Sequence, residues 1–304
     1  MRFILYTSLF VLLLTGCTAT KMAPANSAPS DTVPLPDFDI QGHRGTRGLM
    51  PENTIPAMLK AVELGVNTLE MDVQITRDGQ VLISHDPYIN PAHELLPDGT
   101  ELPAADKQKY VFYEMDYAHI RQFDVGSKFY SSFPEQQKLK TYKPLLSELI
   151  DSVQHYVRAH NLPQVFYNIE IKSRAETDGK YHPVPDEFVQ RVMQVITEKD
   201  IKPWTIIQSF DVRPLQVLHA QHPEVKTALL VENMLGLEAN LRKLGYTPAF
   251  YSPNYKLVTQ TLVADCHRQN IKVIPWTVNK AEEIRQLKAK GVDGIITDYP
   301  NLFR

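Results

Sequence analysis

Short apolar, β-branched segments alternate with amphipathic segments along most of this 304-residue chain. Such an alternation is typical of βαβ units that build a parallel sheet. We expect strands at 38–43, 67–75, 80–85, 165–172, 205–210, 226–231, 249–252, 272–278 and 294–298. We expect helices at 54–64, 144–159, 186–199, 212–221, 256–269 and 280–290. The order and length of residues 37–304 predict one α/β domain, a (β/α)8 TIM barrel.

Nine candidate strands are one more than such a barrel uses, and we place the irregularity at the second and third. Only the tetrapeptide TRDG (76–79) separates these two segments. Asp-Gly between alternating runs is typical of a tight antiparallel hairpin. If its last two residues form a two-residue turn, Asp72 lies opposite His85. Glu70, two residues before Asp72, then shares the same face.

Residues 87–143 interrupt the alternation and are rich in Pro, Tyr, Phe and charged residues. They follow directly after the strand that ends at His85, so we expect an insertion at the mouth of the barrel. There it would act as a lid or as a wall that selects the substrate. The alternative is a surface excursion that only packs against the barrel.

Three carboxylates, Glu70, Asp72 and Glu170, lie in apolar segments that are expected to be strands. Burying an unpaired carboxylate is costly, so the three require positive charge close by. A hard divalent cation, Ca²⁺ or Mg²⁺, supplies that charge and prefers oxygen ligands. Salt bridging to Arg44 and Lys172 without a metal is the alternative, although three acids outnumber these two bases. We therefore predict one divalent cation bound by the three acids.

Two histidines, His43 and His85, fall at the ends of expected strands close to these acids. Because imidazole titrates near neutrality, one ring can accept a proton while the other donates one. A histidine-ligated metal is the competing interpretation, but the surrounding acids suit a hard cation better. We predict that His43 and His85 are the catalytic acid and base, and the sequence does not divide the two roles between them.

Two basic residues belong to the same group. Arg44 follows His43 directly and can bind two phosphate oxygens at once, and Lys172 adds a point charge. We predict that both bind phosphate, with an ordinary salt bridge as the alternative for Arg44.

Nine short motifs follow one another along residues 43–300. They are HRGxxGxxPENT (43–54), ExDV (70–73), TxDG (76–79), HD (85–86), EIK (170–172), QSF (208–210), SPxY (252–255), WTVN (276–279) and GIITDYP (294–300). Together they resemble the glycerophosphodiester phosphodiesterase family, across nearly the whole of the domain. The chain departs from the pattern after residue 86, where many relatives continue xxLxRTT and this one reads PYINPAHELL. We expect its substrate contacts on that side to differ.

The resemblance implies a phosphoric diester hydrolase that converts a small-molecule glycerophosphodiester to sn-glycerol 3-phosphate and an alcohol. It assigns Glu70, Asp72 and Glu170 to the metal. Phe210 and Trp276, at strand ends, would then offer apolar faces to the glycerol backbone, and core packing is the alternative for both. A phosphodiesterase acting on lipids or teichoic polymers remains open. So does a binding protein that captures glycerophosphodiesters without cleaving them, although a binder has no use for a general acid.

The remaining polar residues receive structural interpretations. Thr297-Asp298 is expected to close the last strand of the barrel. The other histidines are interpreted as solvated and without acidic partners: His93, His119, His155, His160, His182, His219, His222 and His267.

The first 36 residues indicate export and a lipid anchor. Residues 1–16 have one early arginine, a short apolar run and no acid, which is typical of a signal peptide. The tetrapeptide LTGC (14–17) resembles the bacterial lipobox, so we predict a lipoprotein signal peptide and membrane attachment through acyl chains on Cys17. Residues 17–36 would form a flexible tether. We expect a periplasm-facing envelope protein, with the outer membrane favoured because Thr18 is not aspartate; a plain signal peptide is the alternative.

The net charge of −3 and the lack of a basic cluster in the sequence argue against a nucleic-acid partner. With Cys17 lipidated, only Cys266 remains and no intrachain disulfide can form. The sequence does not indicate an oligomeric state.

Overall fold

The computed structural model describes Met1 and residues 33–304. The signal peptide predicted at 1–16, the lipidation of Cys17 and the tether as far as residue 32 lie outside the described residues and stay predictions. Among the residues that are described, no helix combines the length and apolar character needed to cross a membrane.

Eight strands form a barrel in which neighbouring strands run parallel, in the order β8-β7-β6-β5-β4-β2-β1-β9. Their bounds are β1 (Asp39–Gly42), β2 (Thr68–Ile75), β4 (Phe166–Ile171), β5 (Thr205–Ser209), β6 (Lys226–Val231), β7 (Phe250–Pro253), β8 (Lys272–Val273) and β9 (Gly294–Thr297). Backbone hydrogen bonds join the two ends of this order, since Asp293 N–H donates to the Val273 oxygen and Ile296 N–H to the Pro275 oxygen. The expected (β/α)8 barrel is confirmed.

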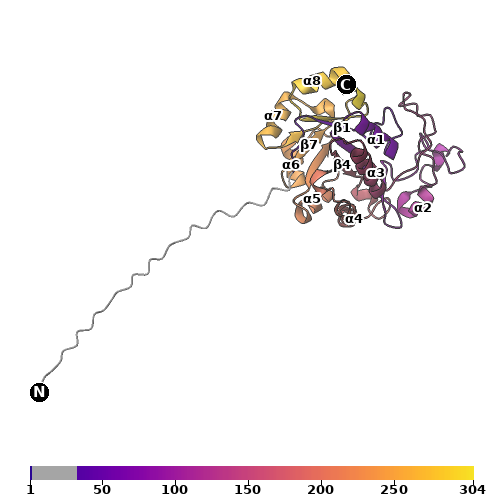
Figure 1. The fold of residues 1–304 in the computed structure, drawn as a ribbon, viewed down its shortest axis with the longest axis horizontal. Helices are drawn as coiled ribbons and strands as arrows, with labels where there is room; N and C mark the ends of the chain where they lie inside the picture. Colours follow the sequence, from indigo (N-terminus) through magenta and orange to yellow (C-terminus); the bar gives the residue numbers. More distant parts are fainter. Residues whose placement is uncertain (2–32) are drawn as a thin grey trace. The chain divides into compact units, whose positions relative to one another are not determined.

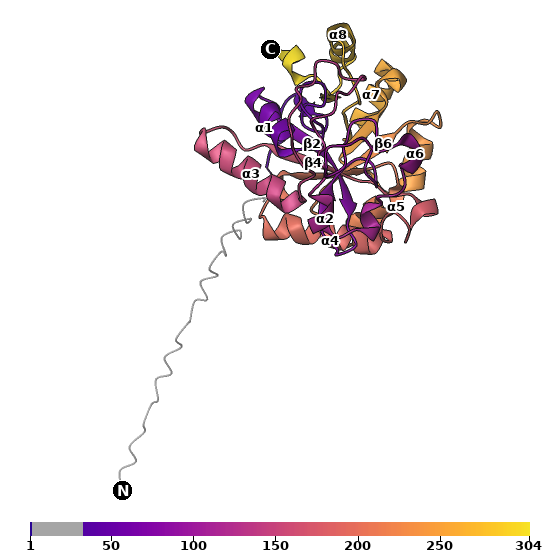
Figure 2. The same cartoon turned by 90° about the vertical axis from the view of Figure 1, so that its right-hand side faces the viewer.

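Helices surround the strands on all sides (Figures 1 and 2). They are α1 (Ile55–Glu63), α3 (Leu146–Ala159), α4 (Pro185–Glu198), α5 (Val212–Gln221), α6 (Leu237–Leu244), α7 (Gln260–Arg268) and α8 (Ala281–Ala289). Six of these were expected from the sequence and α6 was not. The strand expected at 272–278 ends at Val273, because Pro275 has no N–H to donate to a neighbouring strand.

Alternation along β2 separates the core from the barrel interior. Leu69 and Met71 belong to the apolar core between the barrel and the helices. Because successive side chains of a strand point to opposite faces, Glu70 and Asp72 face the interior. The apolar interior residues come from β5 and later strands and from the segment after β8: Ile206, Ala228, Phe250, Ile274 and Ile296.

The hairpin register expected between the second and third strands was wrong by one residue. β3 (Val81–Ile83) runs antiparallel to β2 and pairs Val73 with Ile83. The loop contains three residues, 77–79, and Gly79 closes it at a φ of 77°. Asp72 therefore lies opposite Ser84 instead of His85, since the Ser84 N–H donates to the Asp72 oxygen.

The insertion at 87–143 packs around an apolar cluster of its own. That cluster consists of Ile89, Leu102, Phe112, Met115, Ile120 and Phe123, and Leu82 of β3 packs with them. The insertion, with its short helix α2 (Tyr117–Ile120), projects from one end of the barrel in Figure 1 and lies in front of the strands in Figure 2. A buried ion pair joins Lys143 Nζ to Glu94 Oε1 at 2.6 Å.

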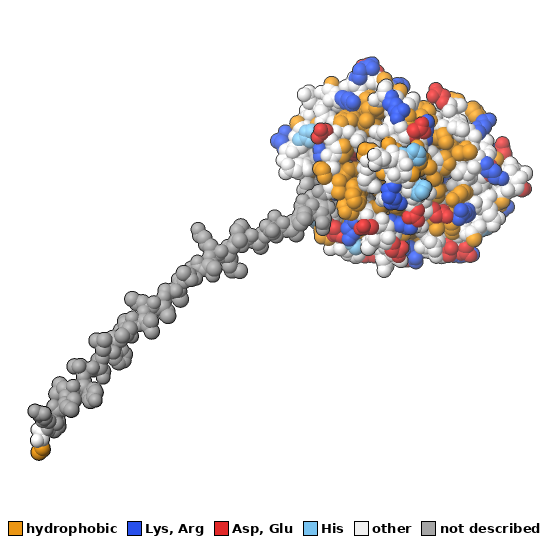
Figure 3. All heavy atoms as spheres, in the orientation of Figure 1, with side chains coloured by type: hydrophobic (Ala, Val, Ile, Leu, Met, Phe, Trp, Pro, Cys, Tyr) orange, Lys and Arg blue, Asp and Glu red, His pale blue; other side chains and the backbone are white. Residues whose placement is uncertain are grey.

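The interpretation of the remaining histidines as solvated and without acidic partners was wrong for three of them. His93 and His182 are buried. His267 Nε2 lies 2.8 Å from Asp293 Oδ2. The contact between His267 and Asp293 joins residues 26 positions apart, so local sequence did not indicate it. On the face seen in Figure 3, basic and acidic side chains are interspersed.

Candidate active site

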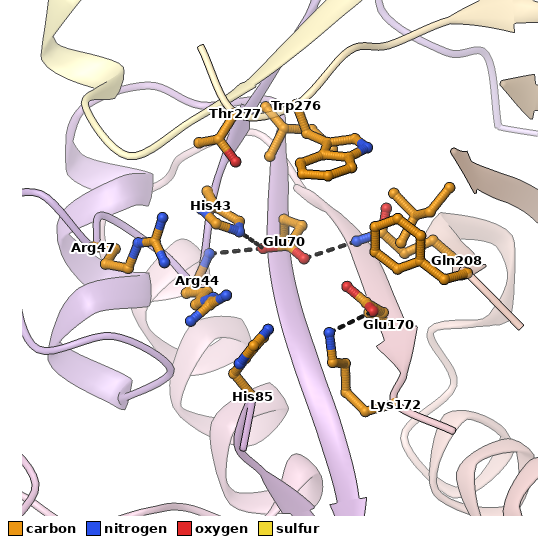
Figure 4. A pocket seen from close by; sticks show the side chains of 13 residues that line it. His43, Arg44, Arg47, Glu70, His85, Glu170, Lys172, Gln208, Trp276 and Thr277 are labelled. Carbon is orange, nitrogen blue, oxygen red and sulfur yellow. Dashed lines mark hydrogen bonds and ion pairs between the residues drawn. The ribbon is translucent and has the colours of Figure 1, made fainter. Parts of the chain in front are cut away.

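A pocket of about 170 Å³ lies at the carboxyl ends of the barrel strands (Figure 4). Its lining residues are His43, Arg44, Arg47, Glu70, His85, Glu170, Lys172, Gln208, Phe210, Leu230, Trp276, Thr277 and Ile296. All of the predicted catalytic, metal and phosphate residues in the described part of the chain line it except Asp72, which lies beside Glu70 and Glu170.

The register between β2 and β4 brings the three acids together. Asp72 pairs with Glu170, and Glu70 precedes Asp72 by two residues on the same face. One carboxylate oxygen from each acid lies within 4.8 Å of the others, and all three acids are buried. Because such close carboxylates repel one another, the cluster could hold a hard divalent cation.

The titration of the acids reflects this crowding. Burial, followed by the charges of Asp72 and Glu170, raises the pKa of Glu70 well above its usual range. Burial also raises the pKa of Glu170, although Lys172 opposes it. Burial acts in the same direction on Asp72, but positive charges led by Arg44 hold that pKa below its usual range. A bound dication would favour the ionised form of all three.

One acid oxygen has a vacant accepting position that suits a metal ligand. Within the described residues, Asp72 Oδ1 is buried and accepts no hydrogen bond. The Lys172 ammonium lies 3.7 Å away, beyond hydrogen-bonding distance. Oxygen ligands of this kind fit Ca²⁺ or Mg²⁺.

Arg44 and Lys172 both contact the acid cluster. Lys172 Nζ lies 2.7 Å from Glu170 Oε1. Arg44 Nη1 lies 2.6 Å from Glu52 Oε1, and its Nε lies 3.2 Å from Asp72 Oδ2. The salt bridges that the sequence left open are therefore present, and both basic residues also border the pocket.

His43 is held in one orientation by a buried carboxylate. Its Nδ1 lies 2.7 Å from Asp298 Oδ1, so Nδ1 carries the proton and Nε2 is left free to accept one. Nε2 faces the acid cluster, 3.9 Å from Glu70 Oε2. Burial and then the charge of Arg47 lower the pKa of His43 to about 4, with Asp298 opposing them. The neutral ring is suited to act as a general base.

Asp298 contacts His43 at the site, and the sequence interpretation did not anticipate it. Its carboxylate accepts hydrogen bonds from Arg47 Nε at 2.8 Å and Asn279 Nδ2 at 2.7 Å, besides contacting His43. An acid directly after a buried strand was the available signal, because β9 ends at Thr297. It was interpreted only as the close of that strand.

His85 lies beyond the end of β3. Figure 4 shows it on the same side of β2 as His43, with Arg44 between the two histidines. Its Nδ1 lies 3.1 Å from Asp86 Oδ1. The side chain of His85 is 33% exposed, compared with 12% for His43.

Phe210 and Trp276 form an apolar wall of the pocket. Their rings meet edge to face with centroids 5.3 Å apart. The Trp276 indole N–H donates to the Ser252 oxygen at 2.8 Å, which fixes its ring. Phe210 is 41% exposed, so its ring is available to a ligand.

The insertion reaches the pocket through Arg47. The Arg47 guanidinium lies 4.6 Å from the centroid of the Phe133 ring. Gln136 Nε2 donates to the Arg47 backbone oxygen at 2.8 Å. These contacts place residues of the insertion next to the His43 side of the site.

Comparisons with known proteins agree with this geometry. Residues 43–302 match the model of the glycerophosphoryl diester phosphodiesterase family. A glycerophosphodiester phosphodiesterase from Caldanaerobacter subterraneus is 30% identical over 86% of this chain and 94% of that protein. One from Bacillus subtilis is 27% identical over 97% of this chain and 95% of its own length.

Solved structures show the same fold. A candidate glycerophosphoryl diester phosphodiesterase from Silicibacter pomeroyi superposes with a TM-score of 0.78 at 31% identity, over 87% of this chain and 91% of its own. An Oleispira antarctica phosphodiesterase, solved with the product sn-glycerol-3-phosphate, gives a TM-score of 0.67 at 22% identity. That superposition covers 86% of this chain and 94% of the other. This chain therefore belongs to the glycerophosphoryl diester phosphodiesterase family of phosphoric diester hydrolases.

Proposed function

We propose that this protein hydrolyses glycerophosphodiesters to sn-glycerol 3-phosphate and an alcohol, with a requirement for one divalent cation, Ca²⁺ or Mg²⁺. The observation that carries the proposal is that three buried acids, two histidines and two basic residues meet at one pocket. The Oleispira relative, which was solved with sn-glycerol-3-phosphate, supports the expected product.

The bound cation and the basic residues would bind the phosphate together. Glu70, Asp72 and Glu170 would hold the cation. When bound, the cation would supply a Lewis acid that polarises a phosphate oxygen and lowers the pKa of a glycerol hydroxyl. Arg44 and Lys172 would bind the phosphate oxygens that remain.

We assign the base to His43 and the acid to His85. His43 Nε2 takes the proton of the attacking hydroxyl, from the substrate glycerol or from water, as the new O–P bond forms. If the glycerol hydroxyl attacks, the product is a cyclic phosphate, which water must then open to give sn-glycerol 3-phosphate. Asp298 would stabilise the imidazolium that results. His85 donates a proton to the alkoxide as the old P–O bond breaks. Its greater exposure supports this role, because an alcohol can leave from the open side.

The insertion at 87–143 would shape the binding of the alcohol group. It begins directly after His85-Asp86, where the chain departs from the pattern of many relatives. Its Asn90 side chain donates to Asp86, the residue that contacts His85. A change in this segment would therefore act on the side of the site where the alcohol departs.

The test is hydrolysis by the purified full-length protein before and after chelation. We expect release of sn-glycerol 3-phosphate from glycerophosphocholine, measured with a coupled dehydrogenase assay. Exhaustive EDTA treatment should abolish the release, and Ca²⁺ or Mg²⁺ should restore it. Activity that survives chelation would remove the metal from the mechanism. Saturable heat of binding without any cleavage would instead support the binding-protein alternative.

A further inference from the structure

Part of the barrel interior is polar. The polar side chains come from β1, β2 and β4 and are each at most 3% exposed: Asp39, Gln41, Thr68 and Asn168. Barrel interiors are filled mainly by branched apolar side chains. A buried polar group is costly unless it is hydrogen-bonded, so this group requires a physical reason.

These side chains form a continuous hydrogen-bonded chain that ends at the acid cluster. Gln208 Nε2 donates to Glu70 Oε1 at 2.8 Å, the contact drawn between the two residues in Figure 4. Asn168 Nδ2 donates to Gln208 Oε1 at 3.0 Å and to Gln41 Oε1 at 2.7 Å. Gln41 Nε2 donates to Asp39 Oδ2 at 2.7 Å. We call Gln41, Asn168 and Gln208 the amide chain.

A carboxylate at each end determines how every amide is turned. Both end carboxylates accept hydrogen bonds from this chain, so Gln208 directs its NH₂ toward Glu70 and its oxygen toward Asn168. Asn168 then directs its NH₂ toward both neighbouring amide oxygens. Gln41 is left with its NH₂ facing Asp39. Turning any one amide around would set two acceptors against each other.

The structure retains this direction although one amide oxygen is left without a partner. Asn168 Oδ1 is buried and accepts no hydrogen bond from the described residues. An unpartnered buried polar atom costs about 1–3 kcal/mol. At the far end, Asp39 Oδ1 accepts a second hydrogen bond from Thr68 Oγ1 at 2.7 Å. The strain is therefore confined to the middle of the amide chain, away from both carboxylates.

The second oxygen of Glu70 is held as firmly as the first. The backbone N–H of Arg44 donates to Glu70 Oε2 at 2.8 Å. Arg44 makes this contact with a φ of 49°, a left-handed conformation that is uncommon for a residue with a side chain. Each oxygen of Glu70 thus has one donor, and the carboxylate cannot rotate without losing both.

We propose that the amide chain is a positioning device that fixes the rotation of the Glu70 carboxylate for the divalent cation. The proposal rests on the proposed function, because it takes Glu70 to be a metal ligand. Gln208 acts on Glu70 directly. Asn168 acts only through Gln208, by preventing its amide from turning. Partners of metal ligands commonly change affinity about 10- to 100-fold when removed.

The test measures binding of Mn²⁺, a cation that shares the preference for carboxylate oxygens. Free Mn²⁺ is followed by electron paramagnetic resonance in titrations of the full-length protein. Gln208→Met should weaken binding about 10- to 100-fold, and Asn168→Leu about tenfold. The double variant should bind no more weakly than Gln208→Met alone, because the effect of Asn168 passes through Gln208.

The matched control is Asn240→Leu, which removes another buried amide. Asn240 donates to the Gly236 oxygen and to Tyr251 Oη, far from the amide chain in sequence and topology. It should lower thermal stability without changing the Mn²⁺ dissociation constant. If Asn168→Leu does not fold, Gln41→Met replaces it with the same expectation.

Two results would overturn the proposal and they are distinguishable. Wild-type affinity in Asn168→Leu, or losses that add fully in the double variant, would show that the amide chain does not position Glu70. If the wild-type protein itself binds no Mn²⁺ and hydrolyses its substrate after chelation, the metal in the proposed function fails as well.

Discussion

At the scale of single residues, the surroundings of His43 act on its pKa in opposite directions. Burial and Arg47 lower its pKa to about 4, whereas the Asp298 carboxylate 2.7 Å away raises it. The net result is a neutral ring whose Nδ1 proton is held and whose Nε2 is free. Asp298 orients the His43 ring, and Arg47 lowers its pKa. Replacing each neighbour in turn therefore tests these two effects separately.

Asp298→Asn should lower kcat about 100-fold or more, with a small effect on KM. The asparagine oxygen can still accept from Nδ1, but the charge that stabilises the imidazolium is lost. Steady-state kinetics with glycerophosphocholine would measure this. Asp293→Asn is the matched control. Asp293 also contacts a histidine, His267, at 2.8 Å, but neither residue lines the pocket. An unchanged kcat in Asp298→Asn would contradict the role given to this carboxylate.

Arg47→Gln should move the acidic limb of the kcat/KM profile to higher pH. The general base must be neutral, so activity falls as pH decreases through the pKa of His43. Removing a nearby positive charge raises that pKa, and the fall then begins at a higher pH. Profiles from about pH 4 to pH 8 would show the shift. The control is Arg77→Gln, which removes an exposed arginine paired with Asp116 and should leave the profile unchanged. An acidic limb that moves to lower pH in Arg47→Gln would contradict the assignment of His43 as the base.

At the scale of elements, local patterns predicted most strands and helices within a few residues. The elements that were predicted wrongly have local causes that cannot be recognised from a pattern of apolar residues. A third loop residue and the left-handed Gly79 shifted the hairpin register by one. Helix α6, with the sequence LEANLRKL, was missed because it is short and half of its eight residues are polar. Register depends on the backbone geometry of a turn, which composition alone leaves open.

The site was predictable where charged residues interrupt buried strands. Glu70 and Glu170 stand out for that reason, because a carboxylate in an apolar run needs a partner. Gln208 and Asp298 do not stand out in the same way. Gln208 has a role because it contacts Glu70, and Asp298 has one because it contacts His43. Such pairings join residues far apart in the sequence.

At the scale of the whole molecule, the polar part of the interior couples stability to pH. Burial raises the pKa of Asp39 from 3.8 to about 6, although hydrogen bonds from Thr68 and Gln41 oppose the shift. The folded state therefore binds this proton more tightly than the unfolded state does. The resulting stabilisation is complete below about pH 4 and is lost as pH rises through 6.

Asp39→Asn should gain stability relative to wild type as pH rises. The amide cannot ionise, it can still accept from Gln41, and its NH₂ can donate to the Thr68 hydroxyl. A shift of about two pKa units corresponds to roughly 3 kcal/mol as an upper bound on the gain. Urea unfolding at about pH 4.5 and pH 7.5 would measure it. Asp37→Asn, at an exposed neighbouring position, is the control; an equal difference from wild type at both pH values would contradict the expectation.

The central claim is that Glu70, Asp72 and Glu170 hold one catalytic dication. The most direct measurement is an anomalous difference map from crystals of the protein grown with Mn²⁺. We expect one peak within roughly 2.0–2.6 Å of an oxygen from each acid, with the Lys172 ammonium displaced from Glu170. A map with no peak among the three acids, and with Lys172 still paired to Glu170, would contradict the claim.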